Sequence, residues 1–139
     1  MTRVVLDASV LASATVAHPN SPSARLLDAA KEGEIEVVAC AELIAELDRA
    51  LSRRYFTARL TEEERSSAPE IVETLAIMLP DPAAPPRLLR DARDDYLVAL
   101  AINGRADAIV TGDRDLLDHA GLKPPAITPR TACERFGLT

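Results

Sequence analysis

Residues 3–11, RVVLDASVL, decide how this chain folds. The first four of them form a short apolar run with two β-branched side chains, which is typical of a strand buried on both faces. Asp7 follows this run directly, and a small, apolar segment at 9–16 comes after it. The stretch therefore predicts a central strand that ends on a carboxylate.

Strand-like and helix-like segments alternate along the rest of the chain. Further strands are predicted at 36–39, 77–79, 108–110 and 126–128. Helices are predicted at 22–31, 41–54, 61–76, 94–103, 113–120 and 129–136. Strands separated by helices predict a parallel sheet with helices on both faces, and such sheets bind ligands outside the carboxyl ends of their strands.

Several predicted helices carry their own start and stop signals. Ser21 is a natural N-cap before Pro22, and Gly33 ends that helix. Thr61 and Glu64 have the spacing of a capping box. The proline-rich segment 80–86, PDPAAPP, must be a loop, and neither half of the chain holds an adequate core alone. We therefore expect one domain over residues 1–139.

Composition narrows the classes of function. No apolar run reaches about 18 residues, and no signal peptide is evident at the N-terminus, so we expect no membrane span. Cys40 and Cys133 stand alone, which favours a cytoplasmic location and no zinc site. The net charge of −6 argues against binding nucleic acid through a basic surface. Carboxylates that hold divalent cations can nevertheless present positive charge to a phosphate.

Acidic residues follow two of the predicted strands. Asp7 follows the first strand, whereas Asp113 and Asp115 follow the strand at 108–110. Taken alone, Asp7 and Asp113 are each explained as helix N-caps. If the two strands are neighbours, however, the three carboxylates converge, and clustered carboxylates repel one another unless cations are bound.

Two predicted helices add further carboxylates. Asp94 and Asp95 both stand at the start of DDYLVALA, and periodicity does not separate them. Glu46 lies at the edge of the apolar stripe of its helix, where a role in a cleft and an ion pair with Arg49 are equally supported. Glu42 lies one turn before Glu46 and is a candidate for a carboxylate that supports the site by contacting one of its residues, without binding the metal or the substrate itself.

Common catalytic motifs are absent from the sequence. It contains no GxGxxG, GxxxxGK[ST] or GxSxG pattern. His18 and His119 have no metal-ligand neighbours in sequence. The remaining chemistry is that of carboxylate oxygens, which suits Mg²⁺ or Mn²⁺ rather than zinc.

Four segments carry a resemblance to a known family. VVLDASVL (4–11), AELIAEL (41–47), DDYLVALA (94–101) and IVTGDRDLL (109–117) resemble, in order, the successive motifs of PIN-domain ribonucleases, above all the VapC-like toxins of toxin–antitoxin systems. The resemblance spans almost the whole chain. It implies a three-layer α/β/α sandwich around a parallel sheet of strand order 3-2-1-4-5.

The resemblance also implies roles for the acidic residues. Asp7, Asp95 and Asp113 match the family's metal-binding aspartates, which selects Asp95 over Asp94, and Asp115 matches a further aspartate of the metal site. Glu46 matches the family's catalytic glutamate.

Two polar residues match positions beside the carboxylates. Ser9 stands where the family commonly has Asn or Ser. Thr111 stands where a Thr or Ser often orients the carboxylates.

The implied activity is Mg²⁺- or Mn²⁺-dependent hydrolysis of RNA phosphodiester bonds by the toxin of a toxin–antitoxin pair. Two rivals stay open: a catalytically silent protein of the same fold that only binds partners, and a receiver-type phosphoacceptor domain. A receiver needs an acidic pair at its first strand and a nearby lysine, whereas Asp7 is unpaired and lysine is scarce.

Two protein partners are expected. The family implies a protein antitoxin, which would lay an extended or helical segment near the acidic groove with an arginine entering it. A homodimer is implied more by the resemblance than by the sequence, and the supporting feature is that segments 11–16 and 26–30 offer more apolar surface than one sheet face needs.

Overall fold

The computed structural model describes residues 1–83 and 92–138, and of residues 92–94 only the helical backbone. The last part of the predicted loop 80–86 and the side chain of Asp94 therefore lie outside the described residues. The strands are β1 (Arg3–Leu6), β2 (Glu36–Cys40), β3 (Ile77–Leu79), β4 (Ala108–Val110) and β5 (Ala126–Ile127). The helices are α1 (Ala8–Val16), α2 (Pro22–Lys31), α3 (Ala41–Leu51), α4 (Arg54–Thr57), α5 (Glu62–Leu75), α6 (Ala92–Asn103), α7 (Arg114–Leu117) and α8 (Pro129–Arg135).

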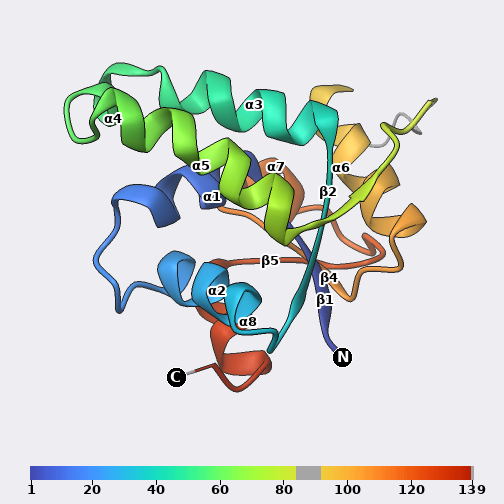
Figure 1. The fold of residues 1–139 in the computed structure, drawn as a ribbon. Coiled ribbons are helices and arrows are strands. Elements are labelled where there is room, and N and C mark those ends of the chain that lie inside the picture. The colour runs from blue at the N-terminus through green and yellow to red at the C-terminus, as the bar shows by residue number, and fades with distance from the viewer. Residues whose placement is uncertain (84–91, 139) are drawn as a thin grey trace.

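The strands form one parallel sheet of order β3-β2-β1-β4-β5 (Figure 1). This order confirms the predicted α/β fold with strand order 3-2-1-4-5. It also excludes the receiver alternative, because doubly wound sheets of the flavodoxin and receiver type have the order 2-1-3-4-5.

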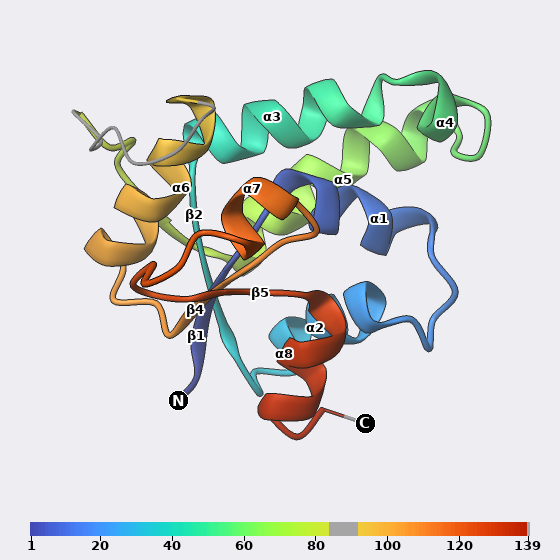
Figure 2. The same cartoon turned by 180° about the vertical axis from the view of Figure 1, so that it is seen from behind.

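Helices cover both faces of the sheet. Helix α6 packs on β1, β2 and β4, whereas α1, α2, α3, α5 and α8 form a group joined by mutual contacts. Figures 1 and 2 show α6 on one side of the strands and α1, α2 and α8 on the other. The arrangement is the predicted three-layer sandwich.

The apolar stripe predicted for α3 consists of Leu43, Ile44, Leu47 and Leu51, and all of them except the half-buried Ile44 are buried in the core. Leu43, Leu47 and Leu51 are fully buried in the continuous core, together with the valines of β1. Burial of each such side chain contributes about 1.5–3 kcal/mol. The helix ends at Leu51 rather than near Arg54, because the amides of Ser52 and Arg53 bond to carbonyls three residues back and tighten the last turn.

Glycine at position 104 allows α6 to lie close to the sheet. A Cβ atom placed on Gly104 would stand 2.7 Å from Cγ1 of Val38, a fully buried residue of β2. Arg3, at the start of β1, donates from Nη1 to the carbonyl of Gly104 at 2.9 Å. The C-terminal end of α6 is thereby anchored at the amino edge of the sheet, so its N-terminal turn lies toward the carboxyl edge.

Candidate active site

The end of β1 lies beside the end of β4. Leu6 pairs with Val110, and the amide of Asp7 donates to the carbonyl of Val110 at 3.0 Å. Asp7 and Thr111 therefore leave the sheet next to each other at its carboxyl edge. The expectation that these two strands are neighbours is confirmed.

Thr111 joins two of the predicted carboxylate positions. Its hydroxyl donates to Oδ2 of Asp7 at 2.6 Å and accepts from the amide of Asp113 at 3.0 Å. Thr111 is fully buried, so this hydroxyl has little freedom to turn toward water. The geometry agrees with the orienting position that the resemblance implies for this residue.

Both N-cap interpretations are also correct. Oδ1 of Asp7 accepts from the amide of Ser9 at 3.3 Å, and Oδ1 of Asp113 accepts from the amide of Asp115 at 2.9 Å. Ser9 is exposed and touches Asp7 through its backbone amide, whereas Asp7, Asp113 and Asp115 are half-buried. Capping does not exclude ligand binding here, because an ionised carboxylate has about four lone-pair sites and each of these hydrogen bonds uses one of them.

Asp95 lies in the first turn of α6 and is fully buried. The helix begins at Ala92, two residues before the start expected from the sequence, so Asp95 is inside the helix rather than at its cap. Burial of a carboxylate is costly unless it is hydrogen-bonded, paired or close to a cation. The complete burial of Asp95 is therefore not explained by the role of a helix cap on the protein surface.

Glu46 contacts a tyrosine. The hydroxyl of Tyr96 donates to Oε2 of Glu46 at 2.6 Å, and Tyr96 is only 3% exposed. Within the described residues Glu46 makes no ion pair with Arg49, so the surface-pair interpretation is wrong. Burial of the phenol, followed by its bond to the Glu46 carboxylate, raises the pKa of Tyr96 far above its usual range.

Glu42 belongs to a more exposed part of the same edge. Its amide donates to Oδ1 of Asp81 at 2.9 Å. Desolvation raises the pKa of Glu42, and the negative charges of Asp81 and Glu46 raise it further. Asp81 is a carboxylate beside Glu42 that the sequence analysis did not single out, and it lies two residues after the end of β3, with Pro80 between. A search for acidic residues within two positions of a strand end finds it.

The cysteines are buried and reduced. Cys40 and Cys133 are free thiols in the structure. Burial raises the pKa of the Cys40 thiol to about 11, so the thiol stays protonated at neutral pH. Neither residue offers a thiolate for metal binding.

The carboxylates fit a hard divalent cation by donor chemistry rather than by a closed cage. All the candidate donors are oxygens, as Mg²⁺ and Mn²⁺ prefer. In the part of the chain that the structure describes, no three His, Cys, Asp or Glu residues stand together closely enough to hold a metal. Mg²⁺ commonly takes one or two carboxylates and completes its shell with water and substrate phosphate. The candidate carboxylates, which form no closed cage, are compatible with such a coordination of Mg²⁺.

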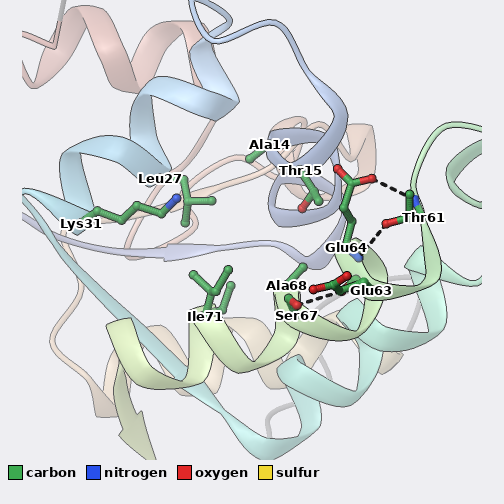
Figure 3. Close-up of a pocket in the computed structure, with 11 residues that line it drawn as sticks. Ala14, Thr15, Leu27, Lys31, Thr61, Glu63, Glu64, Ser67, Ala68 and Ile71 are labelled. Carbon is green, nitrogen blue, oxygen red and sulfur yellow. Dashed lines mark hydrogen bonds between the residues drawn. The ribbon is translucent and has the colours of Figure 1, made fainter.

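A separate apolar groove lies between α1, α2 and α5. Its volume is about 370 Å³. Figure 3 shows Leu27 and Lys31 of α2 facing Ile71 of α5, with the Thr61–Glu64 capping box at one end. We call this feature the α1–α2–α5 groove.

No helix among the described residues has the length and apolar character needed to cross a membrane.

Comparisons with known proteins agree with this geometry. Three solved structures share the fold at 16–22% identity, where the likeness concerns the fold alone. PAE2754 from Pyrobaculum aerophilum is 22% identical with a TM-score of 0.66, and the match covers 98% of this chain and 90% of that one. VapBC2 from Rickettsia felis, bound to a DNA fragment from their promoter, is 16% identical with a TM-score of 0.61, covering 91% and 98%. FitAcB from Neisseria gonorrhoeae is 18% identical with a TM-score of 0.59, covering 91% and 98%.

A search among curated proteins finds no match. The model of one protein family, described as PIN domain, matches residues 3–115. This range includes β1 to β4 and every candidate carboxylate described above, from Asp7 to Asp115. The chain belongs to the PIN domain family.

Proposed function

We propose that this chain is a metal-dependent endoribonuclease and the toxin of a toxin–antitoxin pair. PIN domains are generally nucleases, and two of the structures that share this fold are VapBC2 and FitAcB. The observation that carries the proposal is the Asp7–Thr111–Asp113 arrangement, in which one buried hydroxyl links two acidic residues from neighbouring strand ends. A set of this kind lies where parallel sheets bind ligands.

Three aspartates are the proposed metal ligands. Asp7, Asp95 and Asp113 would hold Mg²⁺ or Mn²⁺, and Glu46 and Asp115 would complete the set directly or through water. When bound, such a cation lowers the pKa of a water molecule and offsets the charge that develops on the phosphate.

The protein's own groups would orient the reaction. Thr111 and the Ser9 amide each hold one oxygen of Asp7, and the Asp115 amide holds one oxygen of Asp113, so both carboxylates have a set orientation and keep lone pairs for a ligand. Glu46 would accept a proton from the attacking water or orient that water for in-line attack. No covalent nucleophile is required, in agreement with the protonated state of the Cys40 thiol.

The net charge makes RNA binding depend on the cation. A chain of charge −6 repels a phosphate backbone unless its carboxylates are offset. The decisive experiment incubates the purified protein with a mixed RNA pool in Mg²⁺, in Mn²⁺ and in chelator, beside the Asp7→Asn variant. Cleavage by the wild type in metal alone supports the proposal. Cleavage that persists in chelator, or equal cleavage by Asp7→Asn, contradicts it.

The silent binding protein remains the second candidate, because no three-residue metal cluster is assembled among the described residues. Absence of RNA cleavage at every metal condition, together with a folded protein, would favour it.

We propose that an antitoxin segment occupies the α1–α2–α5 groove. Its apolar floor includes Leu27 and Ile71, and Ile71 is 45% exposed. Charged groups of both signs, Lys31 and Glu63, stand at the groove, which suits the apolar face of an amphipathic helix with polar edges. The expectation that an arginine of the antitoxin enters the acidic edge of the sheet stays a prediction.

A homodimer remains a proposal, and its original motive is weaker than expected. Most of the apolar side chains of α1 and α2, such as Leu11 and Leu26, are buried in the chain's own core. Of that surface, Ala14 and Leu27 line the groove. The dimer therefore rests on the family resemblance.

A further inference from the structure

We infer that Tyr96 is a positioning residue that holds the Glu46 carboxylate in place for cleavage. The inference rests on the proposed nuclease function, because it assigns a role to a neighbour of one of the proposed catalytic groups. Tyr96 itself would not touch the substrate.

The Tyr96–Glu46 hydrogen bond joins two layers of the molecule. Tyr96 lies in the first turns of α6, directly after Asp95, whereas Glu46 lies on α3. The two residues are 50 positions apart, and their oxygens are separated by 2.6 Å. Figure 2 shows the N-terminal ends of α3 and α6 side by side at the same edge of the sheet. The bond thus links Glu46 to the helix that carries Asp95.

The environments of the two partners differ, and this decides which one orients the other. Tyr96 is 3% exposed, so its ring is held by packing. Glu46 is half-buried on a helix edge and has three rotatable side-chain bonds. A rigid donor therefore restricts a flexible acceptor. In the described part of the chain the bond occupies Oε2, and Oε1 accepts from no protein donor, so Oε1 remains for water or substrate.

Packing alone does not require this hydroxyl. Phenylalanine fills nearly the same volume, and a buried phenol without a partner is costly. The tyrosine is thus better explained by its bond to Glu46 than by core filling. A short bond donated to a carboxylate is also among the stronger hydrogen bonds in proteins.

The test compares Tyr96→Phe with Tyr55→Phe, which removes the hydroxyl of the other tyrosine. Tyr55 is 54% exposed on α4 and outside the proposed site. We expect Tyr96→Phe to lower kcat for RNA cleavage by about 10- to 100-fold, the usual loss for a group that supports a catalytic residue. KM should change little, the melting temperature should fall modestly because a hydrogen bond to a carboxylate is lost, and Tyr55→Phe should match the wild type in kcat. Cleavage is therefore measured at a temperature at which all three proteins are folded. A kcat in Tyr96→Phe equal to that of the wild type overturns the inference.

A double-mutant cycle separates positioning from stability. Glu46→Gln keeps an acceptor for the phenol but removes the charge. If Tyr96 acts through Glu46, adding Tyr96→Phe to Glu46→Gln should cost little further cleavage, so the two effects are not additive. Additive losses of kcat would contradict a role through Glu46.

A metal-free NMR measurement keeps the inference separate from the nuclease proposal. Side-chain coupling constants of Glu46 should report one rotamer in the wild type and averaged rotamers in Tyr96→Phe. If the wild type cleaves no RNA, the nuclease proposal fails, while these couplings still decide whether Tyr96 holds Glu46. Averaged Glu46 rotamers in the wild type overturn the inference even if Tyr96→Phe does not fold.

Discussion

The buried hydroxyl of Thr111 donates to Oδ2 of Asp7 across 2.6 Å, from the end of one strand to the end of its neighbour. The hydroxyl oxygen of Thr111 also accepts a hydrogen bond from the amide of Asp113 at 3.0 Å. One small side chain therefore sets the orientation of one carboxylate and the start of the turn that carries another.

Replacing Thr111 with valine tests this link. Thr111→Val keeps the shape but leaves the Asp113 amide and one Asp7 oxygen without this partner, so unfolding free energy should fall by about 1–3 kcal/mol. RNA cleavage should fall as well, since Asp7 is no longer oriented. Thr111→Ser, which keeps the hydroxyl, should retain most of both properties. Urea unfolding and the cleavage assay measure the two effects, and a fully active, fully stable Thr111→Val would contradict the assigned link.

The contact of Gly104 with Val38 predicts a stability effect away from the acidic edge. Gly104→Ala places a methyl group 2.7 Å from a buried β-branched side chain, and the overpacking should cost about 1–3 kcal/mol. Gly112→Ala is the matched control, because a Cβ there meets nothing within 4 Å. Denaturant unfolding of both variants checks the difference, and equal stability would show that α6 does not lie this close to β2.

The raised pKa of Glu42 predicts a pH-dependent stability difference. The folded state holds the Glu42 proton more tightly than the unfolded state, whose pKa is near 4.5. Its favourable contribution is therefore complete below that value and is lost as the pH rises through the folded-state pKa. Glu42→Gln should be more stable than the wild type at neutral pH, and the difference should vanish in acid.

Unfolding curves between about pH 4 and pH 8 measure this change. Glu73→Gln, an exposed position on α5, controls for the removal of one negative charge. A stability gain that is the same at every pH would argue against a raised Glu42 pKa.

The proposal that an antitoxin segment occupies the α1–α2–α5 groove predicts how a charge introduced into this groove affects the oligomeric state. If an antitoxin segment occupies the groove, Ile71→Asp should leave the dimer of the isolated protein intact in sedimentation at micromolar concentration. Ile102→Asp, on exposed α6 surface, is the control for an added charge. Conversion of Ile71→Asp alone to a monomer would identify the groove as the subunit interface. A monomeric wild type would reject the dimer.

The parts of the fold that local chemistry specifies were predictable. The run Arg3–Leu6, the Ser21 cap and the Thr61–Glu64 capping box all occur where their residues indicate. Strand order followed from the family resemblance, because periodicity alone does not say which strands are neighbours.

Long-range contacts were not predictable from local patterns. The Tyr96–Glu46 bond joins residues 50 positions apart, and nothing in the periodicity of either helix indicates it. The start of α6 at Ala92 was missed because two adjacent aspartates suggested a cap. Asp81 was missed because Pro80 separates it from the end of the three-residue strand β3, whereas Asp7 follows its strand directly.

Cleavage of the RNA pool by Asp95→Asn, measured beside the wild type and beside thermal unfolding of both proteins with and without Mg²⁺, tests the central claim most directly. Asp95→Asn keeps the size of a fully buried side chain but removes the charged oxygen proposed to bind metal. We predict loss of cleavage and of Mg²⁺-dependent stabilisation, with metal-free stability unchanged or higher because asparagine places no charge in this buried position. Full cleavage by a folded Asp95→Asn protein would contradict the assigned metal site.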